Sequence, residues 1–123
     1  MMGKPGLTGM PRLIAAFGNS MAGLKVCWRK EEAFRQEIVA LILAIPLGLW
    51  LGDNGVERSL LISSVLLIAI FETLNSAIEA VVDRIGTDYH ELSGYAKDIA
   101  SASVLLANLL ALMVWGLILY DKF

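Results

Sequence analysis

The longest uncharged stretch of the sequence limits what this chain can fold into. Residues 99–120 contain no acidic or basic side chain. A helix of about 22 residues, rising about 1.5 Å per residue, is as long as the hydrocarbon core of a bilayer is thick. Trp115 and Tyr120 lie near its end, where aromatic side chains collect at membrane interfaces. We therefore predict a membrane-spanning helix over residues 97–120.

The composition favours a chain that is embedded in the membrane over most of its length. Of its 123 residues, 57% are hydrophobic, and the mean hydropathy is +0.67, which is too apolar for a small water-soluble domain. The formal net charge of −2 argues against a general attraction to nucleic acid. The single cysteine, Cys27, excludes an intrachain disulfide and is expected to serve packing. We predict one all-helical membrane domain over residues 1–123.

Two further spans are predicted ahead of the last one. Residues 32–51 are expected to form the first, in which neighbouring helices can satisfy the carbonyl freed by Pro46. Trp50 would mark its far interface, and residues 52–55 form a tight turn of glycine and polar residues. Residues 56–85 are expected to form the second span, with an extension beyond the bilayer.

The segment 10–30 predicts a different kind of helix. Pro11 suits a first helical turn, and the basic residues lie away from the apolar ones. Such a pattern is typical of an amphipathic helix that rests on the membrane surface. The apolar residues that fall within roughly 100° of arc are Leu13, Ile14, Phe17, Met21, Leu24 and Trp28.

The distribution of basic residues predicts the orientation. Cytoplasmic loops of membrane proteins carry an excess of lysine and arginine, and the first turn offers only Arg58. We therefore expect the N-terminus and the loop 86–98 to be cytoplasmic, with Phe123 outside. The basic residues ahead of the first span are Lys4, Arg12, Lys25, Arg29, Lys30 and Arg35.

Four polar residues lie on one side of the second predicted span. Glu72, Asn75, Glu79 and Asp83 fall within an arc of roughly 80°, at about 100° per residue. From Val56 to Glu72 the helix is about 24 Å long against a hydrocarbon core of about 30 Å, so Glu72 is expected near the opposite membrane face. Glu79 would lie about 10 Å further, among the headgroups. We call these four residues the stripe. Since carboxylates are costly in lipid, the stripe predicts a functional site at this boundary.

The two ends of the stripe suit different chemistry. Glu72, poorly solvated at the lipid edge, suits a general base that accepts the proton of a lipid hydroxyl. Glu79 suits Mg²⁺, which binds one or two carboxylates together with substrate phosphates. Glu31 or Glu32, expected at a similar depth relative to the membrane, could complete the metal site. Asn75 could orient a carboxylate or a substrate hydroxyl, and Lys97 could contact phosphate.

Other interpretations stay open from the residues alone. Asp83 could pair with Arg84 between helices, and Lys97 with Asp98 could form a surface pair at a helix start. His90 could be a solvated loop residue. The sequence has no GxxxxGK[ST] phosphate loop, so a nucleotide site would be unconventional. These residues fit either a kinase or a small proton- or cation-coupled carrier.

The stripe and the loop after it resemble the signature of a known family. Residues 72–84 read ETLNSAIEAVVDR and are followed by YHELSG at 89–94 and AKD at 96–98. This signature is similar to that of the small prokaryotic integral-membrane diacylglycerol kinases. The upstream segments EAFRQE at 32–37 and LLISSV at 60–65 are similar as well, so the resemblance covers nearly the whole chain from Arg12 on.

The resemblance implies a fold, an activity and partners. The expected architecture is an N-terminal surface helix with three transmembrane helices, assembled as a homotrimer with active sites shared between subunits. The expected location is the bacterial inner membrane, with the active site on the cytoplasmic side. The expected reaction is phosphorylation of diacylglycerol to phosphatidic acid by ATP with Mg²⁺. Similar proteins act on undecaprenol, which stays open as an alternative lipid.

The resemblance also implies roles for individual residues. Glu72 would be the catalytic base, with Asn75 beside it, and Glu31 and Glu79 would hold the metal. The expected nucleotide contacts are Arg12, Glu31, Glu79, Asp88, Tyr89, His90, Lys97 and Asp98. The expected lipid contacts are Arg12, Ser20, Ala33, Phe34, Arg35, Gln36, Glu37, Trp50, Glu72, Ser101 and Trp115.

Four positions depart from the pattern of the family. Ala15 stands where a basic residue is familiar, and Asn19 where an aromatic one is. Met21 replaces a tryptophan, and Tyr95 replaces an arginine before the AKD segment. These differences concern peripheral nucleotide and lipid contacts, and they leave the carboxylates unchanged.

Overall fold

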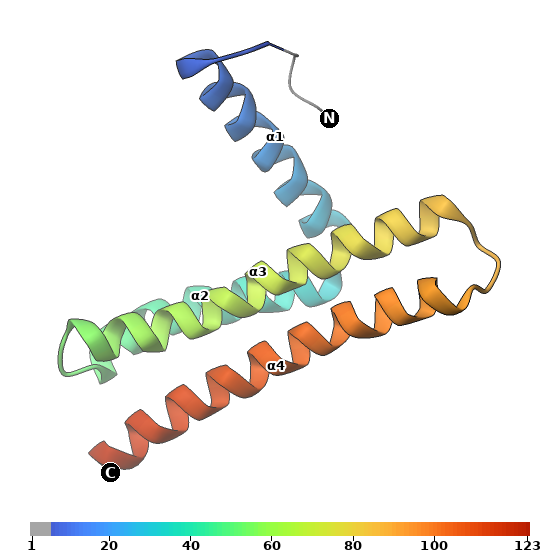
Figure 1. Cartoon of the computed structure of the whole chain (residues 1–123). Coiled ribbons are helices and arrows are strands. Elements are labelled where there is room, and N and C mark those ends of the chain that lie inside the picture. Colours follow the sequence, from blue (N-terminus) through green and yellow to red (C-terminus); the bar gives the residue numbers. More distant parts are fainter. Residues whose placement is uncertain (1–5) are drawn as a thin grey trace.

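The chain forms four α-helices within residues 6–123, the part that the computed structural model describes (Figure 1). Their bounds are α1, Gly9–Lys30; α2, Glu32–Leu51; α3, Gly55–Ile85; and α4, Glu91–Lys122. Of these, α2, α3 and α4 are long and apolar enough to cross a membrane. The predictions of an all-helical chain and of three candidate spans are therefore confirmed.

The breaks between the helices have local causes. Glu31 has an extended backbone, with φ −115° and ψ 106°, and separates α1 from α2. The side chain of Asn54 accepts a hydrogen bond from the backbone N–H of Glu57 at 2.9 Å and so caps α3. His90 Nδ1 accepts the N–H of Leu92 at 3.1 Å, so α4 begins at Glu91, earlier than the predicted start of the last span at residue 97.

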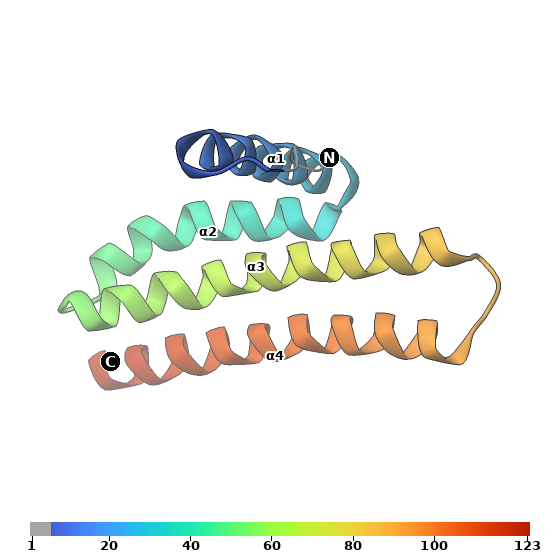
Figure 2. The same cartoon turned by 45° about the horizontal axis from the view of Figure 1, so that its top comes forward.

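The long helix α3 lies between α2 and α4, and both neighbours run antiparallel to it (Figure 2). Small side chains allow α4 to approach α3 closely, since Ala107 and Ala111 pack with Ile68 and Phe71. These four residues form the apolar contact between the middle parts of the two helices.

The end of the bundle away from the α3–α4 loop is held by polar contacts. Lys122 Nζ lies 2.7 Å from Asp53 Oδ2 and 2.8 Å from Glu57 Oε1. Nearby, Trp115 Nε1 donates a hydrogen bond to the carbonyl of Leu61 at 3.0 Å. The last turns of α4 are thus attached to the α2–α3 turn and to the first turns of α3.

The first helix departs from the other three at an angle (Figure 1). No residue of α1 is buried, and apolar side chains such as Phe17 are exposed. Its C-terminal end is joined to α2 by Arg35, whose Nη1 donates to the carbonyls of Trp28 at 2.7 Å and Arg29 at 3.3 Å. This contact satisfies carbonyls that have no partner within a helix end.

A glycine permits the close approach of α2 to α3. A Cβ added at Gly48 would lie 2.8 Å from Ile62 Cγ1 and 3.3 Å from Leu61 Cβ, whereas one added at Gly116 would meet no described heavy atom within 4 Å. We expect Gly48→Ala to lower the thermal denaturation midpoint in detergent, because overpacking costs about 1–3 kcal/mol. Gly116→Ala is the matched control and should not lower it. Equal midpoints for the two variants would contradict this packing.

Candidate functional site

A cavity of about 760 Å³ separates the C-terminal half of α1 from α3. Polar groups reach it from both sides, including Ser20 and Glu31 on one side and Thr73 and Ser76 on the other. The residues of α3 that line this cavity are neighbours in sequence of the predicted carboxylate stripe, since Thr73 follows Glu72 and Ser76 follows Asn75. The fold thus brings the end of α1 next to this part of α3, although the two segments are about 40 residues apart.

Glu72 is the buried member of the stripe. The whole residue is 8% exposed, and no hydrogen bond or ion pair within residues 6–123 involves its carboxylate. The charges of Glu37, Glu31 and Glu79 act on it. Four carboxylates from three parts of the chain therefore share one region, which we call the carboxylate centre: Glu31, Glu37, Glu72 and Glu79.

Asn75 is oriented by a neighbour one turn away. Its Nδ2 donates a hydrogen bond to Glu79 Oε1 at 3.0 Å. Its Oδ1 is buried and meets no donor within residues 6–123. A buried carbonyl oxygen without a donor is costly, so this atom is available to a ligand in the carboxylate centre.

Cys27 lies at the same centre, which the sequence did not indicate. It lines the cavity between α1 and α3. Partial burial, followed by the charges of Glu31 and Glu72, raises the pKa of the Cys27 thiol. The thiol therefore stays neutral beside the carboxylates. No pattern within the sequence could have placed it there, because the contact joins two different helices.

A second polar pocket, of about 370 Å³, lies at the loop between α3 and α4. Four of the predicted nucleotide contacts line it together: Asp88, Tyr89, His90 and Lys97. Asp98 is exposed and is not among its lining residues. We call this cavity the loop pocket; all its lining residues are Val82, Asp83, Gly86, Thr87, Asp88, Tyr89, His90, Ser93, Gly94 and Lys97.

One ion pair crosses the loop pocket. Lys97 Nζ lies 2.7 Å from Asp83 Oδ1, so this pair joins the end of α3 to the start of α4. The sequence left two other pairings open, Asp83 with Arg84 and Lys97 with Asp98. In the structure, Asp83 and Lys97 pair with each other instead. His90 serves as the cap of α4 while it lines the pocket, and Tyr95 donates a hydrogen bond to Glu91.

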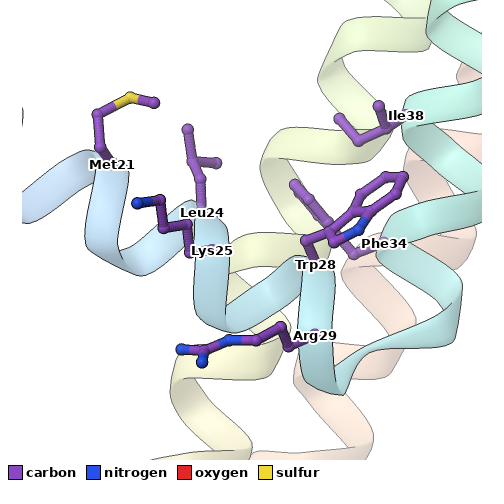
Figure 3. A pocket seen from close by; sticks show the side chains of 7 residues that line it. All are labelled: Met21, Leu24, Lys25, Trp28, Arg29, Phe34 and Ile38. Carbon is purple, nitrogen blue, oxygen red and sulfur yellow. The ribbon is translucent and has the colours of Figure 1, made fainter.

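A third, mostly apolar pocket of about 450 Å³ lies between α1 and α2 (Figure 3). Phe34 is 3% exposed and lines this pocket together with Trp28, while Lys25 and Arg29 extend from α1 (Figure 3). Of the predicted lipid contacts, Phe34 alone lines this pocket. Ala33, Gln36 and Ser101 are exposed.

Several predicted site residues lie away from these cavities. Arg12 is exposed in the first turns of α1, at the end that leads away from the bundle (Figure 1). Trp50 is 77% exposed at the far end of α2, and Trp115 contacts Leu61. Arg35 holds the end of α1. A single chain therefore does not bring all the predicted nucleotide and lipid contacts to one place.

The oxygen atoms at the carboxylate centre suit a magnesium ion in the company of a nucleotide. Within residues 6–123, no three His, Cys, Asp or Glu side chains are placed to hold a metal ion by themselves. Magnesium bound with a nucleotide needs only one or two carboxylates, because phosphate oxygens and water supply the rest. Glu31 and Glu79, with the free amide oxygen of Asn75, are donors of that kind.

Comparison with known proteins gives one consistent result. The model of the prokaryotic diacylglycerol kinase family matches residues 18–119. A diacylglycerol kinase of Escherichia coli K12 is 54% identical over 94% of this chain and 95% of its own length. One from Haemophilus influenzae is 50% identical over 92% of this chain and 96% of its own. One from Pseudomonas aeruginosa is 42% identical over 93% of each.

Proposed function

We infer that this chain, which belongs to the prokaryotic diacylglycerol kinase family, is a diacylglycerol kinase of a bacterial membrane. It transfers the terminal phosphate of ATP to the free hydroxyl of diacylglycerol and forms phosphatidic acid and ADP. Relatives that are 42–54% identical over nearly the full length carry that name, and three helices are apolar enough to span a bilayer.

The observation that supports the mechanism is that Glu72 is a buried residue whose carboxylate has no hydrogen-bond or ion-pair partner within residues 6–123. We place the hydroxyl of diacylglycerol beside it. The hydroxyl oxygen attacks the γ-phosphorus in line, the bond from that phosphorus to the bridging oxygen of ADP breaks, and the hydroxyl proton passes to Glu72. Little covalent chemistry is left to the protein, so the rate depends on positioning and on neutralising charge.

The loop pocket is the proposed place for the nucleotide. Lys97 would supply a cation for phosphate, and Asp88, Tyr89 and His90 would contact the rest of the nucleotide. Asn75 would direct its free Oδ1 toward the substrate hydroxyl or the metal. Glu31 and Glu79 would hold Mg²⁺, which would supply positive charge to neutralise the phosphates. Glu31 lies between α1 and α2 and Glu79 lies on α3, so the two carboxylates would keep the phosphates close to Glu72 from two parts of the chain.

We further propose an orientation and an assembly. The basic residues of α1 and of the start of α2 support a cytoplasmic position for these segments and, with them, for the carboxylate centre. The exposed apolar side chains of α1 suit a position on the membrane surface. Arg12 lies away from the loop pocket of its own chain, which supports a homotrimer in which Arg12 completes the site of another subunit.

The lipid preference is tested by a side-by-side assay. In mixed micelles with labelled ATP and Mg²⁺, we expect rapid formation of phosphatidic acid from diacylglycerol and much slower phosphorylation of undecaprenol. The Glu72→Gln variant, expressed and purified in the same way, serves as the control for contaminating kinases. Faster turnover of undecaprenol would reassign the lipid substrate, and absence of turnover with both lipids would contradict the proposed function.

A further inference from the structure

We propose that Asp83 is a positioning residue for phosphoryl transfer, which holds the ammonium group of Lys97 at the border between the loop pocket and the carboxylate centre. The inference rests on the proposed function, in which Lys97 contacts a phosphate of ATP. Asp83 belongs to the stripe of polar residues on α3, but the proposed function gives it no part, and the inference gives it a role distinct from binding substrate.

The geometry of the pair supports this role. Asp83 follows Glu79 by one helical turn on α3, and its Oδ1 lies 2.7 Å from Lys97 Nζ on α4. Both side chains line the loop pocket. The charge of Glu79 also acts on Lys97. The ammonium group is therefore paired with a carboxylate of the loop pocket, one helical turn along α3 from a carboxylate proposed to bind the metal.

The pair leaves Lys97 able to bind phosphate. A lysine ammonium carries three N–H donors, and the ion pair with Asp83 uses one, so two remain for phosphate oxygens. The lysine side chain is long and flexible, and ordering such a side chain opposes binding. If Asp83 already holds the ammonium group before ATP binds, the cost of ordering the lysine side chain does not reduce the affinity for ATP.

A contribution to folding alone does not account for the pair. The Asp83 and Lys97 side chains are 65% and 43% exposed, and ion pairs with such exposure add little to stability. Neighbouring contacts at the same end, such as the cap from His90 to Leu92, do not depend on the pair. Loss of the Asp83 charge should therefore change catalysis while the folded chain persists.

The test compares Asp83→Asn, Lys97→Met and the double variant in the full-length protein. We expect Asp83→Asn to lower kcat/KM for ATP on the order of 10- to 100-fold, with KM for diacylglycerol and the thermal midpoint unchanged. Asp83→Glu should restore part of the loss. Arg84→Gln, at the exposed neighbouring position, is the matched control and should keep wild-type kinetics.

The double variant separates this inference from the proposed function. If Asp83 acts through Lys97, Asp83→Asn should have no further effect in the Lys97→Met background. Full activity of Lys97→Met would overturn the proposed role of Lys97. An impaired Lys97→Met with a fully active Asp83→Asn would overturn only the role of Asp83. Additive losses, or a lowered thermal midpoint in Asp83→Asn, would likewise exclude a positioning role.

Discussion

The variant Glu72→Gln is expected to lose roughly 10²- to 10⁴-fold in turnover of diacylglycerol, which is the usual contribution of a general base. Glutamine has nearly the size of glutamate, so the packing around this 8% exposed residue should be kept. It cannot accept the hydroxyl proton, however. The measurement is the rate of ADP release at saturating lipid, together with binding of ATP and Mg²⁺ to the purified variant.

The control for this experiment lies on the same helix. Glu57 is at the other end of α3, where it pairs with Lys122 at 2.8 Å, so Glu57→Gln should keep its turnover. Near-normal turnover of Glu72→Gln, with intact nucleotide binding, would exclude Glu72 as the base.

The variant Glu79→Gln should show its effect in the metal requirement. Its carboxylate is proposed to bind Mg²⁺. Removal of a residue that only hydrogen-bonds to a metal ligand already costs about 10- to 100-fold in metal affinity or activity. We expect the Mg²⁺ concentration for half-maximal rate to rise roughly 10-fold or more. The glutamine oxygen can still accept the hydrogen bond that Asn75 Nδ2 donates at 3.0 Å, so the orientation of Asn75 should be kept.

A titration of the rate with Mg²⁺ at constant ATP measures this effect. Glu32→Gln is the matched control, because Glu32 is exposed at the start of α2 and is not part of the carboxylate centre. It should titrate like the unchanged protein. An unaltered Mg²⁺ dependence in Glu79→Gln would count against a ligand role.

The helices and the stripe could be predicted because both depend on residues that are close in sequence. The uncharged run at 99–120 requires a helix of crossing length, and α4 contains it. The positions of Glu72, Asn75 and Glu79 on one side of α3 follow from the helical repeat. The hydrogen bond between Asn75 and Glu79 is an instance of this local geometry, since residues four apart are neighbours on a helix surface.

Contacts between helices could not be predicted in the same way. Pairing of Asp83 with Lys97, in place of Arg84, depends on how α3 and α4 are rotated about their axes. The influence of Glu37 on Glu72 and that of Glu72 on Cys27 depend on how α1 and α2 meet α3. No periodicity within one helix carries that information.

The sequence by itself determined that the chain is helical, that three helices can span a membrane, and that one of them carries Glu72, Asn75 and Glu79 on one side. These properties follow from local hydropathy and the helical repeat. Only the tertiary structure decided that Glu37 joins Glu31, Glu72 and Glu79, and that Lys97 pairs with Asp83. Such contacts arise from the packing of small residues and glycines such as Gly48, which sets the distance and register between helices.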